Sequence, residues 1–116
     1  MAWQCVMYEE HPSVPLWKLK DVEISPHGME IEWVPWKELP VGAMWFNEEE
    51  ELCVMLPSGE EWNIDRGRKL GIRPRWNRTG TPPNITVMPS INHVGEYHGF
   101  LRDGKLTDDI EGRTYG

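Results

Sequence analysis

The chain has very little cysteine, with only Cys5 and Cys53 among its 116 residues. Two cysteines cannot build the disulfide framework that holds many small secreted domains together. The cysteines and histidines together form no zinc-binding motif, because no CxxC, HxxxH or HxH spacing occurs. Structural zinc needs four Cys or His ligands in closely spaced pairs. We therefore expect free thiols in a reducing compartment, no metal and no cofactor. Cys53, inside "LCVML", is expected to be a small buried apolar residue.

Long apolar runs are also missing. No window approaches the ~20 apolar residues of a membrane helix, so no membrane association is expected. The N-terminal "MAWQCVMYEE" has neither a basic start nor a long apolar run, and we expect no signal peptide. No internal repeat, low-complexity tract or linker divides the chain. These absences predict a single domain over residues 1–116, in the cytoplasm.

Tryptophan, proline and glycine are plentiful. Seven of the twelve aromatic residues are tryptophan, and each brings a large apolar area and one N–H that needs a partner. The ten prolines and eleven glycines are spread at turn-like spacings, which favours many short strands over helices. The sequence predicts an all-β or mainly β domain, a sandwich or barrel of about eight short strands with at most one short helical turn.

Several strands are expected on either side of Pro and Gly turns. The segment 43–47 is expected to pair with 51–56 around a run of glutamates, and a turn at 57–59 leads into a further strand. In the segment 84–91, Pro89 must lie at a strand edge or a bulge, because proline donates no ladder hydrogen bond.

Three further elements are predicted from local signals. A hairpin is expected over 21–34, with one apolar and one acidic face. Asp103 and Gly104, between two strand-like runs, are a strong hairpin signal. The one helix-like piece is 63–71, where Asp65 is expected to cap a single turn.

The net charge of −7 is unevenly distributed. Residues 1–61 carry thirteen acidic and three basic side chains, whereas residues 62–116 carry six acidic and nine basic ones. One interpretation is that the two halves attract each other across the fold. The other is a surface with one acidic and one basic face, whose acidic face binds a basic protein. In one form of this interpretation, the acidic half imitates the charge of a nucleic acid and occupies a protein that normally binds one. The candidate acidic contacts are Glu48, Glu49, Glu50 and Glu51.

The segment 66–78 carries six cations and Trp76. Basic residues interleaved with an aromatic ring suit contacts with a nucleic-acid backbone together with base stacking. The net charge opposes this, because it repels polyanions at long range. Nucleic-acid binding through this segment, with Trp76 and Arg78 as contacts, is therefore the less favoured alternative.

The chain contains a serine, a histidine and an aspartate, the residue types of a catalytic triad, at Ser90, His98 and Asp103. "MPSIN" is not the glycine-rich strained turn on which a serine nucleophile usually lies, so we expect Ser90 to hydrogen-bond backbone beside Pro89. No catalytic residue is predicted from these types alone. A metal-dependent hydrolase that uses His98 with Asp103 or Cys53 is kept as a further alternative.

Four motifs carry a family resemblance. "GAMWF", "LPSGEEW", "WNRTGTPPNITVMPSI" and "YHGFLRDGKL" occur in this order and resemble a family of small domains of unknown function in bacteriophages and other mobile elements. The resemblance covers residues 42–110. It implies a mainly β domain, a phage or prophage source and action in the host cytoplasm, and it implies no reaction. Relatives have cysteines near the hairpin histidine that look like a zinc site; here 47–51 holds none, and Tyr97 precedes His98.

The resemblance and the charge pattern together predict an accessory protein that binds a host or phage protein, inhibits a host defence factor, and is a monomer or a homodimer. His98 is expected to be structural, with its ring paired to backbone, Asn84 or Ser90. The candidate binding residues around the motifs are Trp76, Arg78, Asn84, His98, Arg102 and Asp103.

Overall fold

The computed structural model describes residues 2–20, 33–66 and 77–115. The described chain is mainly β with one 3-10 turn, η1 (Trp36–Glu38), which confirms the predicted fold class. The strands are shorter and more numerous than about eight, because turns and bends repeatedly interrupt the ladders. Their bounds are β1 (Trp3–Gln4), β2 (Val6–Glu10), β3 (Leu16–Leu19), β4 (Val34–Pro35), β5 (Ala43–Phe46), β6 (Leu52–Met55), β7 (Glu61–Asn63), β8 (Asn77–Thr81), β9 (Asn84–Met88), β10 (Ile91–His93), β11 (Tyr97–Gly99), β12 (Leu101–Arg102) and β13 (Lys105–Leu106).

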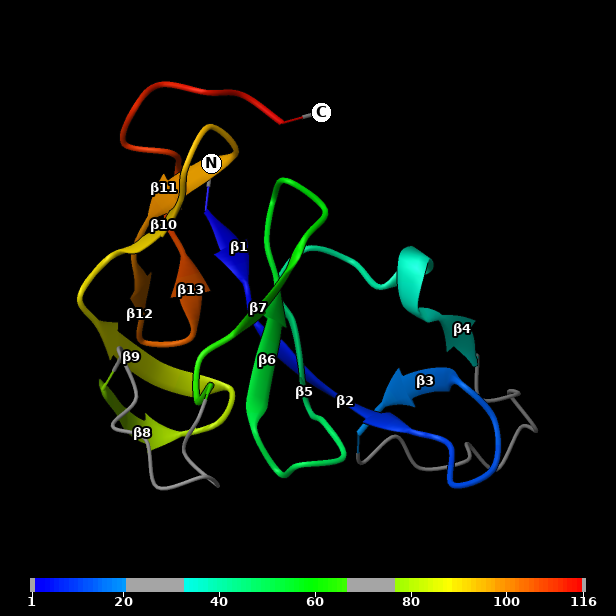
Figure 1. Cartoon of the computed structure of the whole chain (residues 1–116). Coiled ribbons are helices and arrows are strands. Elements are labelled where there is room, and N and C mark those ends of the chain that lie inside the picture. The colour runs from blue at the N-terminus through cyan, green and yellow to red at the C-terminus, as the bar shows by residue number, and fades with distance from the viewer. Residues whose placement is uncertain (1, 21–32, 67–76, 116) are drawn as a thin grey trace, which may run out of the picture.

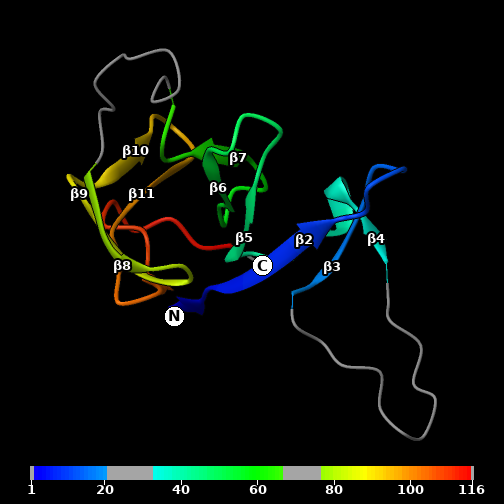
Figure 2. The same cartoon turned by 90° about the horizontal axis from the view of Figure 1, so that it is seen from below.

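The largest sheet has the strand order β4-β3-β2-β5-β6-β7. β2 and β5 are parallel, and the other neighbours in this sheet are antiparallel. The predicted pairing of 43–47 with 51–56 is confirmed, with Trp45 opposite Cys53. Figure 2 shows β2 running from the main body of the molecule out to β3, β4 and η1.

The middle of this sheet is buried on both faces. Along β6, Leu52 and Val54 lie in the larger core cluster, and Cys53 and Met55 lie in a smaller cluster on the opposite face. A strand buried on both sides reads as a continuous apolar run, as "LCVM" does. Each fully buried aliphatic side chain contributes about 1.5–3 kcal/mol to folding, so the two clusters hold the sheet from both sides.

The C-terminal half forms short paired strands beside this sheet (Figure 1). β8 pairs with β9, β10 pairs with β11, and β13 lies between β1 and β12. Pro89 follows the end of β9, as predicted for a residue that cannot donate to a ladder. The run "YHGFL", expected as one strand, is divided between β11 and β12, which have different partners.

The predicted Asp-Gly turn joins β12 to β13 and packs closely against its neighbours. Gly104 has φ +75°, and a Cβ there would lie 2.8 Å from the carbonyl oxygen of Pro83. Its N–H donates to the carbonyl of Ile85, and its carbonyl accepts from the N–H of Cys5. Glycine is therefore required both by the backbone conformation and by the lack of space for a side chain.

The remaining predicted elements fall partly outside the described residues. Most of the expected hairpin over 21–34 does so, as do Trp76 and residues 67–75 of the basic segment. Asp65, expected to cap a helical turn, is buried and bonds to other parts of the fold.

Candidate functional site

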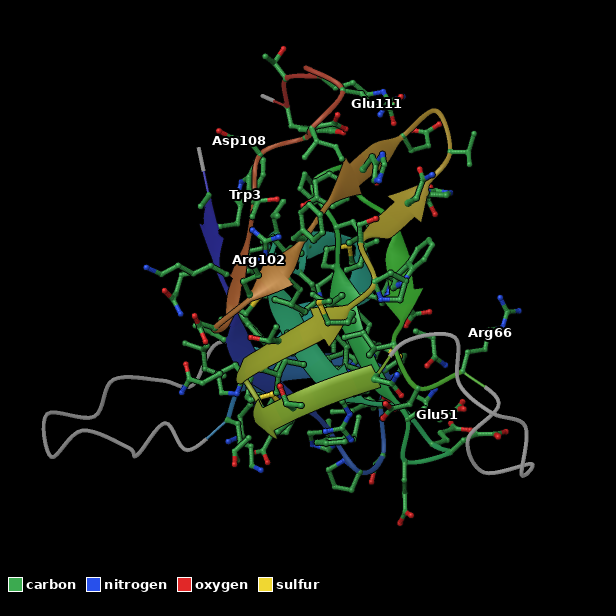
Figure 3. All side chains as sticks on the ribbon, turned by 90° about the vertical axis from the view of Figure 1, so that its left-hand side faces the viewer. Trp3, Glu51, Arg66, Arg102, Asp108 and Glu111 are labelled. Atoms are coloured by element: carbon green, nitrogen blue, oxygen red, sulfur yellow. The ribbon has the colours of Figure 1, made fainter. Side chains whose placement is uncertain are left out.

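Residues 107–115, which we call the C-terminal strap, lie against β11. The N–H of His98 donates to Asp109 Oδ2 at 3.0 Å, and the N–H of Ile110 donates to the carbonyl of His98 at 2.8 Å. Figure 3 shows Glu111 of the strap at the same end of the molecule as the β10–β11 hairpin. The strap therefore fixes the backbone of His98 from outside the hairpin.

Asp109 is a buried carboxylate that anchors the strap. Besides His98, its oxygens accept hydrogen bonds from the N–H of Glu111 at 2.7 Å, Arg113 Nη1 at 2.9 Å and the hydroxyl of Tyr115 at 2.9 Å. Burial alone would raise the pKa of Asp109, but these hydrogen bonds hold it well below its ordinary value. The pKa of Arg113 is raised, chiefly by its hydrogen bond to Asp109. Asp109 is therefore an ionised carboxylate in the folded protein.

The ring of His98 lies between a hydroxyl and a carboxylate. Its Nε2 lies 3.1 Å from Ser90 Oγ, and its Nδ1 lies 3.1 Å from Glu111 Oε2. Because an ionised carboxylate only accepts hydrogen bonds, the ring hydrogen belongs on Nδ1, and Nε2 accepts from the Ser90 hydroxyl. The expected pairing of His98 with Ser90 is confirmed. The acid beside the ring is Glu111, and Ser90, which was also expected to hydrogen-bond backbone, contacts the His98 ring with its hydroxyl.

Asn84, Arg102 and Asp103 gather at a different place, around the β12–β13 turn. The N–H of Asp103 donates to Thr86 Oγ1 at 3.0 Å, and the Arg102 guanidinium lies 4.0 Å from the centre of the Phe100 ring. The turn is thereby held onto β9. Sequence reasoning grouped these residues with His98 because all of them lie in the recurring motifs, and Arg102 and Asp103 share one motif with His98, but β11 and β12 belong to separate sheets.

Arg78 of the basic segment is engaged inside the fold. Its Nε and Nη2 donate to the two carboxylate oxygens of Asp65 at 2.9 and 3.1 Å, and Asp65 also accepts the N–H of Leu52. This bidentate pair joins β8 to the segment that follows β7, and the bond from Leu52 connects the same carboxylate to β6. Arg66 is exposed, and residues 67–76 lie outside the described residues.

The acidic turn, residues 47–51 between β5 and β6, is organised by one side chain. Asn47 Oδ1 accepts the N–H of Glu49 at 2.9 Å and the N–H of Glu51 at 3.0 Å. The N–H of Asn47 in turn donates to the carbonyl of Glu51. The side chains of Glu48, Glu49 and Glu50 are exposed on this hydrogen-bonded loop.

Glu51 differs from the three glutamates before it. It is 8% exposed, and its Oε1 accepts a hydrogen bond from Asn63 Nδ2 at 3.1 Å, so this candidate contact is buried while the other three are exposed. Phe46, directly before the turn, is 44% exposed. Sequence reasoning missed Phe46; the signal was its place at the end of a strand next to a charged turn.

The two cysteines are free, as predicted, and both are buried, as predicted for Cys53. Burial raises the pKa of Cys5 to about 12, and burial together with nearby carboxylates raises the pKa of Cys53 to about 12. Neutral thiols are poor metal ligands and nucleophiles. Within residues 2–20, 33–66 and 77–115, no three His, Cys, Asp or Glu side chains gather as a metal site would require.

No protein-family model matches the chain, and no curated protein and no solved structure matches it. In the part of the chain that the structure describes, no helix is long and apolar enough to cross a membrane.

Proposed function

We propose that this chain is a phage- or prophage-encoded accessory protein that acts in the host cytoplasm by binding a basic protein through the acidic turn. The observation that carries the proposal is the turn itself: Glu48, Glu49 and Glu50 are exposed together on a loop held by Asn47, beside exposed Phe46. Its position at one extremity of the β5–β6 hairpin is visible in Figure 1.

This arrangement favours recognition of a protein for three reasons. Hydrogen bonds to Asn47 order the loop before binding, which reduces the entropy lost on association. Three adjacent carboxylates attract a basic surface and accelerate encounter. The ring of Phe46 supplies an apolar anchor next to the charges, and aromatic residues are enriched among the side chains that dominate binding energy.

The partner class that this surface fits is a host protein whose basic face otherwise binds phosphates, such as a nucleic-acid-binding defence factor. Clustered carboxylates occupy such a face by imitating the charge of the nucleic acid. The excess of acidic side chains in residues 1–61 adds to the attraction for such a basic face.

The test is affinity capture from nuclease-treated host lysate, followed by reconstitution with the purified captured protein. The test variant carries Glu48→Gln, Glu49→Gln and Glu50→Gln. The control carries Glu10→Gln, Glu38→Gln and Glu60→Gln, which change the net charge equally at exposed positions elsewhere.

We expect one protein to be retained near stoichiometry, with affinity reduced at least tenfold in the test variant and little changed in the control. Affinity should also weaken with added salt. An equal loss of affinity in both variants would mean that only the net charge matters, which would contradict a defined binding site. Capture that disappears on nuclease treatment would favour the segment 66–78 and nucleic acid instead.

A further inference from the structure

We propose that Ser90, His98 and Glu111 form a nucleophilic site that hydrolyses small carboxylic esters. This activity goes beyond the binding role, and it belongs to the end of the molecule opposite the acidic turn. Figure 3 shows Glu111 and Glu51 far apart at these two ends. The two proposals therefore fail independently.

The contacts follow the order of a catalytic triad, from a serine hydroxyl to a histidine ring to a carboxylate. Ser90 Oγ meets His98 Nε2, and Glu111 Oε2 meets the other ring nitrogen, each at 3.1 Å. Glu111 thereby holds the tautomer in which Nε2 is free to accept a proton from the serine. Two backbone hydrogen bonds to the strap, through Asp109 and Ile110, keep the histidine from shifting.

The site is open to a small substrate. The side chains of His98 and Glu111 are 22% and 48% exposed, and Ser90 lies in the irregular stretch between β9 and β10. Met88, two residues before Ser90, and Ile110, next to Glu111, are large exposed apolar side chains. Of the two, Ile110 is held at the site by its N–H, which donates to the carbonyl of His98, and its exposed side chain is the candidate apolar contact for the acyl or aryl group of a small ester.

Asn92 supplies a candidate donor for the developing oxyanion. It is exposed and lies directly opposite His98 in the β10–β11 ladder. Residues paired across antiparallel strands project from the same face of the sheet. A side-chain amide on that face is the kind of group that stabilises the tetrahedral intermediate of acyl transfer.

The reaction follows from these roles. Ser90 Oγ attacks the ester carbonyl carbon while His98 Nε2 takes the hydroxyl proton. The bond from carbon to the alkoxy oxygen then breaks, and the leaving alcohol receives that proton from Nε2. Water next attacks the acyl-serine, His98 takes a proton from the water, and Ser90 Oγ recovers it as the carboxylic acid leaves. One ester and one water yield one acid and one alcohol.

The test uses the full chain with p-nitrophenyl acetate as substrate and a fluorophosphonate as covalent probe. We expect a burst of p-nitrophenol near one equivalent and a single phosphonylated residue, located at Ser90 by peptide mass spectrometry. Ser90→Ala should abolish both, whereas Ser13→Ala, which alters an exposed serine elsewhere, should change neither.

Two further variants separate catalysis from folding. Asn92→Ala and Glu111→Gln should each lower kcat by about 100-fold, with KM little changed, while the melting temperature stays near that of the wild type. A folded wild-type chain that is not labelled at Ser90, or ester hydrolysis that survives Ser90→Ala, would overturn the proposal. Neither result depends on whether a protein partner is found.

Discussion

The acidic turn and the C-terminal strap contain similar side chains in opposite environments. In the turn, Glu48, Glu49 and Glu50 face solvent, and the backbone beneath them is held by Asn47. In the strap, Asp109 is buried and accepts hydrogen bonds from backbone and side-chain donors. The difference shows that the supply of donors, and not the density of carboxylates, decides whether an acidic residue is buried.

This contrast assigns different roles to the two regions. A carboxylate surrounded by donors stabilises the fold and is unavailable to a partner. Exposed carboxylates contribute little to stability, because water already solvates them, and they remain available for binding. Variants in each region should therefore separate stability from recognition.

The largest effect is expected at the buried carboxylate. Asp109→Asn removes the charge that pairs with Arg113 and converts one acceptor oxygen into a donor that faces other donors. We expect a loss of about 3 kcal/mol in the free energy of unfolding, measured with urea. Glu96→Gln, at an exposed position of the turn between β10 and β11, should change it by less than about 0.5 kcal/mol.

The stability difference between the wild type and Asp109→Asn should depend on pH. A carboxyl whose pKa is depressed by folding stabilises the protein above its unfolded pKa of about 4, and this stabilisation is lost as the pH falls toward the lower folded value. The wild type should therefore melt well above Asp109→Asn at pH 7, and the gap should narrow below about pH 4. A difference in melting temperature that stays constant from pH 7 to pH 2 would mean that the ionised form of Asp109 is not what stabilises the wild type.

An intermediate effect is expected at the residue that organises the acidic turn. Asn47→Ala removes the acceptor for the N–H groups of Glu49 and Glu51, and we expect a loss of about 1 kcal/mol in the free energy of unfolding. Asn77→Ala, at an exposed strand position, serves as the control. If partner binding relies on a preordered loop, Asn47→Ala should also weaken it with the charges intact; unchanged stability would contradict the role assigned to Asn47.

The smallest effect on stability is expected from the exposed charges. The combined Glu48→Gln, Glu49→Gln and Glu50→Gln variant should unfold within about 0.5 kcal/mol of the wild type, because it changes no buried contact. Calorimetric melting compares the two directly. A loss above about 1 kcal/mol would mean that these side chains support the fold, and the contrast between the regions would fail.

Much of the fold could be predicted from local signals. The strands on either side of the glutamate run, the break at Pro89 and the turn at Asp103 and Gly104 each follow from a residue type with a restricted backbone or from an apolar run. The division of "YHGFL" could not be predicted. It arises because β11 pairs with β10 while β12 pairs with β13, and these partners are chosen by tertiary packing.

The candidate sites were predictable only in part. His98 and Ser90 were singled out together, but their third partner, Glu111, lies thirteen positions after His98, in a segment without regular structure. Asp103 was the nearer acid in sequence, and nothing in its spacing excluded it. Likewise, the buried state of Glu51 depends on Asn63 across the β6–β7 pair, which local sequence does not reveal.

The sequence by itself determined the mainly β class, the turns and the excess of acid in the first half of the chain. These follow from backbone restrictions and composition, which act over a few residues or over the whole chain. Only the tertiary structure decided which carboxylates are buried and which histidine contacts are made. Those outcomes depend on donors and acceptors brought together from distant positions, as with His98 and Asp109, and such contacts exist only once the sheets have packed.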